Sequence, residues 1–172
     1  MSKKSKIGHT NTSQEIVENI LNISSYNATI NVKVISNKNE NNYIIKQEFK
    51  SEVSNLQEVV EPSNIAGTKI IREGNKLTLE NSKLNLSSMI ENYQYISSNN
   101  LDLSSFIEDY KKDSKAYYEE SENEIKMYAT GNVKCQKTLY IDKKTELPTQ
   151  LEIGWTNKSN KVYILYNEVE IK

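Results

Sequence analysis

NATINVKV, residues 27–34, is the stretch that decides the fold. Its apolar side chains at positions 28, 30, 32 and 34 alternate with polar ones, which is typical of a strand with one buried face. The alternation returns at 43–49, and further extended segments are expected at 57–61, 68–72, 76–80, 116–120, 124–130, 134–142, 148–155 and 161–171. Many short strands joined by turns predict one curved antiparallel sheet.

Two amphipathic helices are expected against that sheet, which makes the fold class α+β. Thr12 and Glu15 have the spacing of a capping box, and the apolar residues at 16, 17, 20 and 21 form a helical stripe. A second helix is expected over 101–112, capped by Asp102 or Ser104. The segment 86–95 fits helix and strand equally. The polar stretches 36–42 and 94–100 are expected to be loops and candidate hinges.

Composition and charge limit the function. The chain of 172 residues has a net charge of −1, and no long apolar run could form a transmembrane helix. The balanced charge argues against a nucleic-acid partner, which requires a clustered basic excess. Residues 1–12 are expected to be a flexible tail or an expression remnant, and 13–172 a single domain.

The residues that usually carry catalysis are scarce. His9 is the only histidine and lies in the expected tail, while Cys135, the only cysteine, shares a strand face with Leu139 and Ile141. A buried structural thiol is therefore favoured over a nucleophile. The acidic run at 119, 120, 122 and 124 is typical of a solvated sheet edge. We predict no catalytic, metal-binding or cofactor-binding residue, and no enzymatic activity.

Tyrosine is the remaining informative residue type, with 11 copies. Tyrosine combines apolar area with a polar tip and suits protein interfaces, although sheet propensity alone also explains its abundance. We expect Tyr140 and Tyr166 in the core. The candidates for partner contact are Tyr93, Tyr95, Tyr117 and Tyr118, which lie in polar, weakly patterned segments.

The segment 139–148, LYIDKKTELP, followed by TQLEI at 149–153, carries a family resemblance. It resembles the hairpin of LolA/LolB-like lipoprotein carriers, in which an Asp-x-x-Thr-Gly-Leu-Pro turn joins two strands. Here Glu146 replaces the glycine, so the turn is open to a different closure. The resemblance covers roughly residues 13–172 and, with the composition, extends to the GerS-like spore-germination lipoproteins of clostridia.

This resemblance implies an incomplete barrel wrapped around helices, in a single LolA-like domain. It also implies an extracytoplasmic lipoprotein of the spore envelope, between the forespore membranes. The membrane anchor would be an N-terminal lipid that this chain lacks, with Met1 standing where the acylated cysteine would be. The implied role is non-catalytic: binding and activating a zinc-dependent, CwlD-like N-acetylmuramoyl-L-alanine amidase, which supports muramic-δ-lactam formation in the cortex and germination.

The alternative function is that of a carrier holding an acyl chain or a lipoprotein inside the half-barrel, which requires a continuous apolar cavity. An open sheet also leaves unpaired edges, so a strand-swapped homodimer is expected to be accessible.

Overall fold

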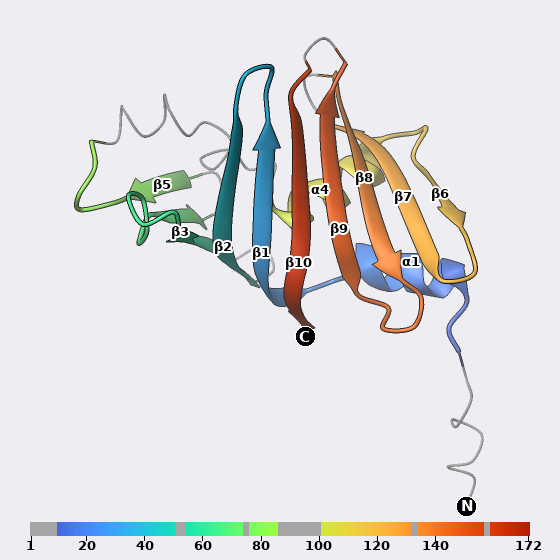
Figure 1. Ribbon diagram of the computed structural model, residues 1–172. Coiled ribbons are helices and arrows are strands. Elements are labelled where there is room, and N and C mark those ends of the chain that lie inside the picture. The colour runs from blue at the N-terminus through green and yellow to red at the C-terminus, as the bar shows by residue number, and fades with distance from the viewer. Residues whose placement is uncertain (1–9, 51–53, 74–75, 86–100, 132–133, 157–158) are drawn as a thin grey trace, which may run out of the picture.

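A computed structural model describes residues 10–50, 54–73, 76–85, 101–131, 134–156 and 159–172. These residues form one antiparallel sheet with two helices on one side of it (Figure 1). The helices are α1 (Ser13–Leu21) and α4 (Leu103–Lys112). The strands are β1 (Ser25–Ile35), β2 (Glu40–Lys50), β3 (Ser54–Glu61), β4 (Lys69–Glu73), β5 (Lys76–Glu80), β6 (Tyr117–Glu120), β7 (Glu124–Gly131), β8 (Cys135–Asp142), β9 (Pro148–Trp155) and β10 (Lys161–Ile171). None of the described helices is long and apolar enough to cross a membrane.

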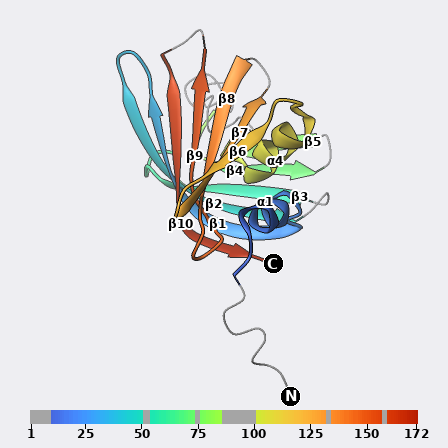
Figure 2. The ribbon, with the colours of Figure 1, turned by 90° about the vertical axis from the view of Figure 1, so that its right-hand side faces the viewer.

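The strand order is β5-β4-β3-β2-β1-β10-β9-β8-β7-β6. The two halves of the chain each form a meander, and β1 and β10 join them by antiparallel pairing over Tyr26–Ile35. Figure 2 shows the sheet curving around α1 and α4. The end strands β5 and β6 are not paired with each other, so the sheet stays open. The expected α+β class, a curved antiparallel sheet wrapped around helices, is confirmed.

The helices begin where the sequence indicates. Thr12 caps α1, because its side chain accepts from the Glu15 N–H while the Glu15 carboxylate accepts from the Thr12 N–H. Asp102 caps α4 in the same way, by accepting from the Ser104 N–H at 3.1 Å. Basic residues close the last turn of α4, where they oppose the negative end of the helix dipole.

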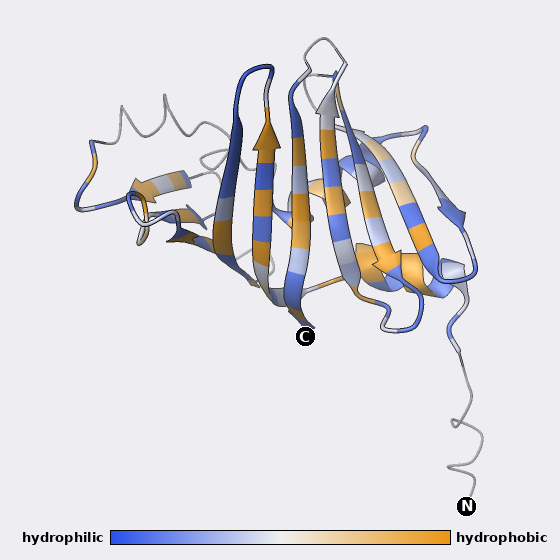
Figure 3. Ribbon diagram, in the orientation of Figure 1, coloured by the Kyte–Doolittle hydropathy of each residue, from blue (hydrophilic) through white to orange (hydrophobic). Residues whose placement is uncertain are grey.

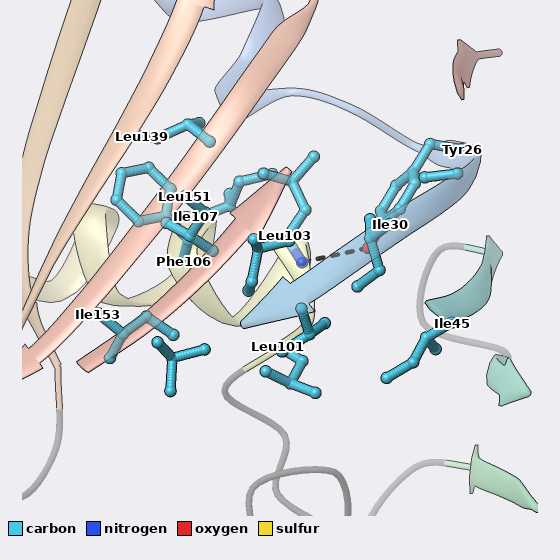
Figure 4. Packing of buried hydrophobic residues seen from close by; sticks show 14 of the residues in the cluster. Tyr26, Ile30, Ile45, Leu101, Leu103, Phe106, Ile107, Leu139, Leu151 and Ile153 are labelled. Carbon is cyan, nitrogen blue, oxygen red and sulfur yellow. Dashed lines mark hydrogen bonds between the residues drawn. The ribbon is translucent and has the colours of Figure 1, made fainter. Parts of the chain in front are cut away.

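Alternate side chains of each strand point toward the helices, which we call the inner face, or away from them, the outer face. Figure 3 shows the resulting alternation of apolar and polar residues along the strands. Inner-face residues of β1, β2, β7, β8, β9 and β10 pack with both helices into one core. Figure 4 shows Phe106, Ile107 and Leu103 of α4 among Tyr26, Ile30 and strand leucines and isoleucines. The helices therefore occupy the inside of the curve.

A buried polar network fixes the start of α4 to the sheet. The Tyr26 hydroxyl donates to Asp102 and accepts from the Leu103 N–H at 3.1 Å. Asn55 Nδ2 donates to the second Asp102 oxygen at 2.9 Å. Burial raises the pKa of the Asp102 carboxyl, and the bond from Tyr26 opposes that shift. The network thus ties β1 and β3 to one helix terminus.

A buried ion pair fixes the middle of α4. Lys137 of β8, only 1% exposed, lies 2.6 Å through its Nζ from Asp109 Oδ2 and donates to Ser105 Oγ at 3.2 Å. Gly131 makes room for this pair, since a Cβ there would lie 2.7 Å from Asp109 Oδ2 and from Cys135 Sγ. A larger residue here would require the Asp109 or Cys135 side chain to shift.

Two expectations are corrected by the structure. The loop expected over 36–42 is shorter, because β2 begins at Glu40 and its first polar residues pair with Ile35, Val34 and Lys33. Backbone ladder bonds extend this hairpin beyond the core, which side-chain patterning does not reveal. Tyr140, expected in the core, lies half-buried on the outer face, while Tyr166 does pack against the core. The ambiguous segment 86–95, the loop 94–100 and His9 lie outside the described residues.

Candidate partner-binding face

The outer face of the sheet carries two neighbouring rows of cross-strand partners. Partners in an antiparallel pair point to the same side, so the register places each row on one surface. The first row consists of Tyr117, Tyr128, Thr138, Glu152, Tyr163, Lys33 and Asn42. The second consists of Glu119, Lys126, Tyr140, Gln150, Leu165, Asn31 and Ile44. These rows run from β6 to β2 across seven strands, and neither helix lies over them (Figure 1).

Tyrosines gather at the β6–β8 end of these rows, which we call the tyrosine end. The rings of Tyr117 and Tyr128 stack with centroids 4.8 Å apart, and Tyr117 is 51% exposed. The Tyr128 hydroxyl donates to Glu119 Oε2 at 3.2 Å. Between β7 and β8, Lys126 Nζ lies 5.3 Å from the centroid of the Tyr140 ring. The aromatic surface is thus held in place by side-chain contacts.

Two tyrosines of this end, Tyr128 and Tyr140, have raised pKa values. Burial, followed by the nearby Glu119 charge, raises the pKa of Tyr128 above its ordinary value. Burial and the Glu152 carboxylate raise the pKa of Tyr140 to about 12. Both hydroxyls therefore remain hydrogen-bond donors at neutral pH, and no base for catalysis arises here.

A groove of about 630 Å³ crosses the other end of the rows, over β2, β1, β10 and β9. We call it the amide groove. Its outer-face lining consists of Asn31, Lys33, Ile35, Asn42, Ile44, Glu61, Gln150, Tyr163 and Leu165. A second groove, about 450 Å³, lies over β3, β2, β1 and β10 and is lined by Glu48, Glu58, Glu168 and Glu170 among others. A third, about 280 Å³, shares Tyr163 with the first.

The structure describes two of the four tyrosines expected to contact a partner, and these two lie on opposite faces of the sheet. Tyr117 lies exposed on the outer face, whereas Tyr118 points inward and packs half-buried against the core. Tyr93 and Tyr95 lie outside the described residues. The sequence reasoning missed Tyr128 and Tyr163, although strand alternation at 124–130 and 161–171 places both opposite the apolar positions. That alternation was the signal that could have found them.

The described residues offer little catalytic chemistry. Cys135 is buried, as expected, and burial raises the pKa of its thiol, which disfavours the reactive thiolate. Within the described ranges, histidine, cysteine and acidic side chains nowhere gather in a group of three that could hold a metal ion. Glu119 and Glu120 are exposed on the edge strand β6, as the acidic run predicted.

No protein-family model matches this sequence, and no curated protein gives a significant sequence match. Solved structures do resemble it. An uncharacterized conserved protein from Thermus thermophilus has a TM-score of 0.56 and 10% identity, over 94% of this chain and 88% of that one. The LolA superfamily protein NE2245 from Nitrosomonas europaea has a TM-score of 0.49 and 12% identity, over 95% and 94%. The structure of the CwlD amidase from Clostridioides difficile in complex with the GerS lipoprotein has a TM-score of 0.45 and 17% identity, over 95% of this chain and 95% of that one.

The Thermus likeness shows a shared fold, and at 10% identity it shows nothing about activity. The TM-scores of the other two structures lie below 0.5. Fold and site together define the class: an open, curved antiparallel sheet filled on its inner side by helices, with a tyrosine-rich outer face over which neither described helix lies. The grooves described above lie on that outer face.

Proposed function

We propose that this chain is a non-catalytic, extracytoplasmic lipoprotein that binds and activates a CwlD-like cell-wall amidase. The observation that carries the proposal is the outer face with its stacked tyrosines, over which neither described helix lies. Tyrosine is enriched at the centres of protein interfaces, where its ring is buried and its hydroxyl is hydrogen-bonded. A face of this kind therefore favours a protein-binding role over an enzymatic one.

The class of partner comes from the sequence resemblance at 139–153. That segment forms the β8–β9 hairpin, closed by a bond from the Asp142 N–H to the Leu147 carbonyl at 3.1 Å. The same resemblance supports a lipid anchor at the N-terminus and a place in the spore envelope, between the forespore membranes. The amidase would carry the zinc and the chemistry, and this chain would support muramic-δ-lactam formation in the cortex and germination.

The carrier alternative has less support. Holding an acyl chain needs a continuous apolar cavity inside the curved sheet. In the described part of the chain, inner-face residues such as Ile30, Ile45 and Leu139 are fully buried against the helices. The residues that would line a lipid cavity are therefore already packed against each other.

A strand-swapped homodimer belongs to the same proposal. β6 is four residues long and ends the strand order, so its outer backbone groups can accept another strand. The charged Glu119 and Glu120 on this strand counteract indiscriminate pairing of the edge.

The tyrosine end is where we place the amidase. Replacing Tyr117 and Tyr128 together by alanine should weaken binding of a purified CwlD-like amidase by at least about tenfold, because central tyrosines dominate interface energy. Sedimentation of mixtures at several concentrations measures both this affinity and the mass of the free chain.

Leu77→Ala is the matched control, since Leu77 is 49% exposed on β5 at the opposite edge. It should leave the affinity unchanged. No complex with the unaltered chain, or equal loss from the Leu77 variant, would contradict the proposal. A free chain that stays monomeric at every concentration would remove the homodimer from it.

A further inference from the structure

The amide groove has the size and position of a small-ligand site. Its volume of about 630 Å³ lies within the range of roughly 300–1,000 Å³ that such sites occupy. It is built on four neighbouring strands, β2, β1, β10 and β9, whose registers fix the spacing of the side chains. A site on paired strands is preorganised, because the backbone does not move to receive the ligand.

Three polar side chains of the groove are uncharged and could contact a ligand. Asn31 and Asn42 project their amides from β1 and β2, and Tyr163 projects its hydroxyl from β10. Within the described residues, these three side chains take part in no hydrogen bond. Gln150 adds a third amide, which donates to Glu152 Oε1 at 2.7 Å. The groove thus offers several neutral donors and acceptors in one place.

The charges of the groove disfavour ionic ligands. Lys33 lies 3.3 Å through its Nζ from Glu40 Oε1, so its charge is already matched. Glu61, on the wall formed by β3, would repel a phosphate or a carboxylate. A single carboxylate is too few to hold a divalent cation. The charges therefore favour neither an anion nor a divalent cation, and the uncharged amides and hydroxyl suit a neutral ligand.

Apolar walls complete the groove. Ile44 and Leu165 flank Asn31 on either side, and the half-buried ring of Tyr163 flanks Lys33. Polar amides on the floor make the groove a poor place for an acyl chain, which would leave those amides unpaired. A ligand with many hydroxyls and with apolar C–H faces satisfies both features, because sugar rings stack on aromatic rings and hydrogen-bond to amides.

We propose that the amide groove binds a neutral oligosaccharide of amide-bearing sugars. This inference goes beyond the amidase-binding role and does not depend on it, because the groove lies at the β2–β9 end of the outer face and the amidase is placed at the tyrosine end. Acetamido groups on such sugars complement the amides of Asn31, Asn42 and Gln150, since each can donate and accept.

The test uses the whole chain and chitotetraose as the probe. Titration of isotope-labelled protein, followed by NMR, should shift the side-chain amide signals of Asn31, Asn42 and Gln150 with a dissociation constant of about 1 mM or tighter. Tyr163→Ala should raise that constant at least about tenfold, and Tyr163→Phe, which keeps the ring and loses the hydroxyl, should give an intermediate value.

Leu77→Ala is the control, because Leu77 is an exposed apolar residue of β5 that does not line the groove. It should leave the constant unchanged, and dispersed spectra establish that each variant is folded. Absence of localised shifts at about 10 mM sugar, or shifts that survive Tyr163→Ala, overturns the proposal. If an amidase shifts the amide signals of the groove and the sugar does not, the groove contacts a protein, and this outcome also overturns the proposal.

Discussion

Glu146 adopts a backbone conformation that ordinarily belongs to glycine. Its φ is 60°, and its N–H donates to the Asp142 carbonyl at 2.7 Å to close the turn between β8 and β9. The left-handed region costs a residue with a Cβ roughly 1–2 kcal/mol. The turn therefore closes on a left-handed residue even though glycine, present in the resembling family pattern, has been replaced by glutamate.

Glu146→Gly should stabilise the protein by about 0.5–1 kcal/mol. The gain is smaller than the strain removed, because glycine also raises the entropy of the unfolded chain. Urea unfolding measures the change in the free energy of unfolding. Glu122→Gly is the control: Glu122 lies exposed between β6 and β7 without a positive φ, so its substitution should not stabilise. A Glu146→Gly protein with a lower free energy of unfolding than the unaltered one would contradict the claim that Glu146 is strained.

At the scale of elements, α4 is held on the sheet by the Lys137–Asp109 pair. Lys137 is 1% exposed and Asp109 is 14% exposed, so breaking the pair leaves the lysine charge in the core. Removal of one partner of a buried pair typically costs about 3–5 kcal/mol, whereas replacement of both by apolar residues is near neutral or stabilising. We therefore expect the pair to specify the position of α4 on the sheet more than it adds to the free energy of unfolding.

A double-mutant cycle tests this attachment. Asp109→Leu should lower the free energy of unfolding by about 3–5 kcal/mol, and Lys137→Met should lower it less, since Asp109 retains some contact with water. The double variant should recover most of the loss. Lys143→Met, which breaks the exposed pair with Glu120, should change the free energy of unfolding far less than either single change at the buried pair. Additive losses in the double variant would show that the two side chains are not coupled.

The elements themselves could be predicted from local patterns. Alternation in 27–34 and the Thr12–Glu15 box specify β1 and α1, because both signals lie within a few residues. The seating of α4 could not be predicted in this way. Alternation at 135–141 does predict that Lys137 points inward. No sequence pattern near Lys137 indicates that its partner is Asp109, which lies on a helix distant in the sequence. The outer-face rows likewise depend on strand order, which brings Tyr163 beside Lys33.

At the scale of the whole molecule, the two faces of the sheet divide the work. The inner face is packed against α1 and α4, so its side chains specify the fold. The outer face is free of the helices and carries the tyrosine end and the amide groove. The two proposals place an amidase at one end of this face and a sugar chain at the other, and neither proposal requires a catalytic group from this chain.

The most direct test of amidase activation is the rate at which a CwlD-like amidase releases peptide from cell-wall glycan as this chain is added. We predict a rise of at least about tenfold that saturates at a fixed ratio of the two proteins, equivalent to about 1.4 kcal/mol off the barrier. The Tyr117 and Tyr128 double variant should need far more protein for the same rise. An unchanged rate with saturating chain present would contradict activation.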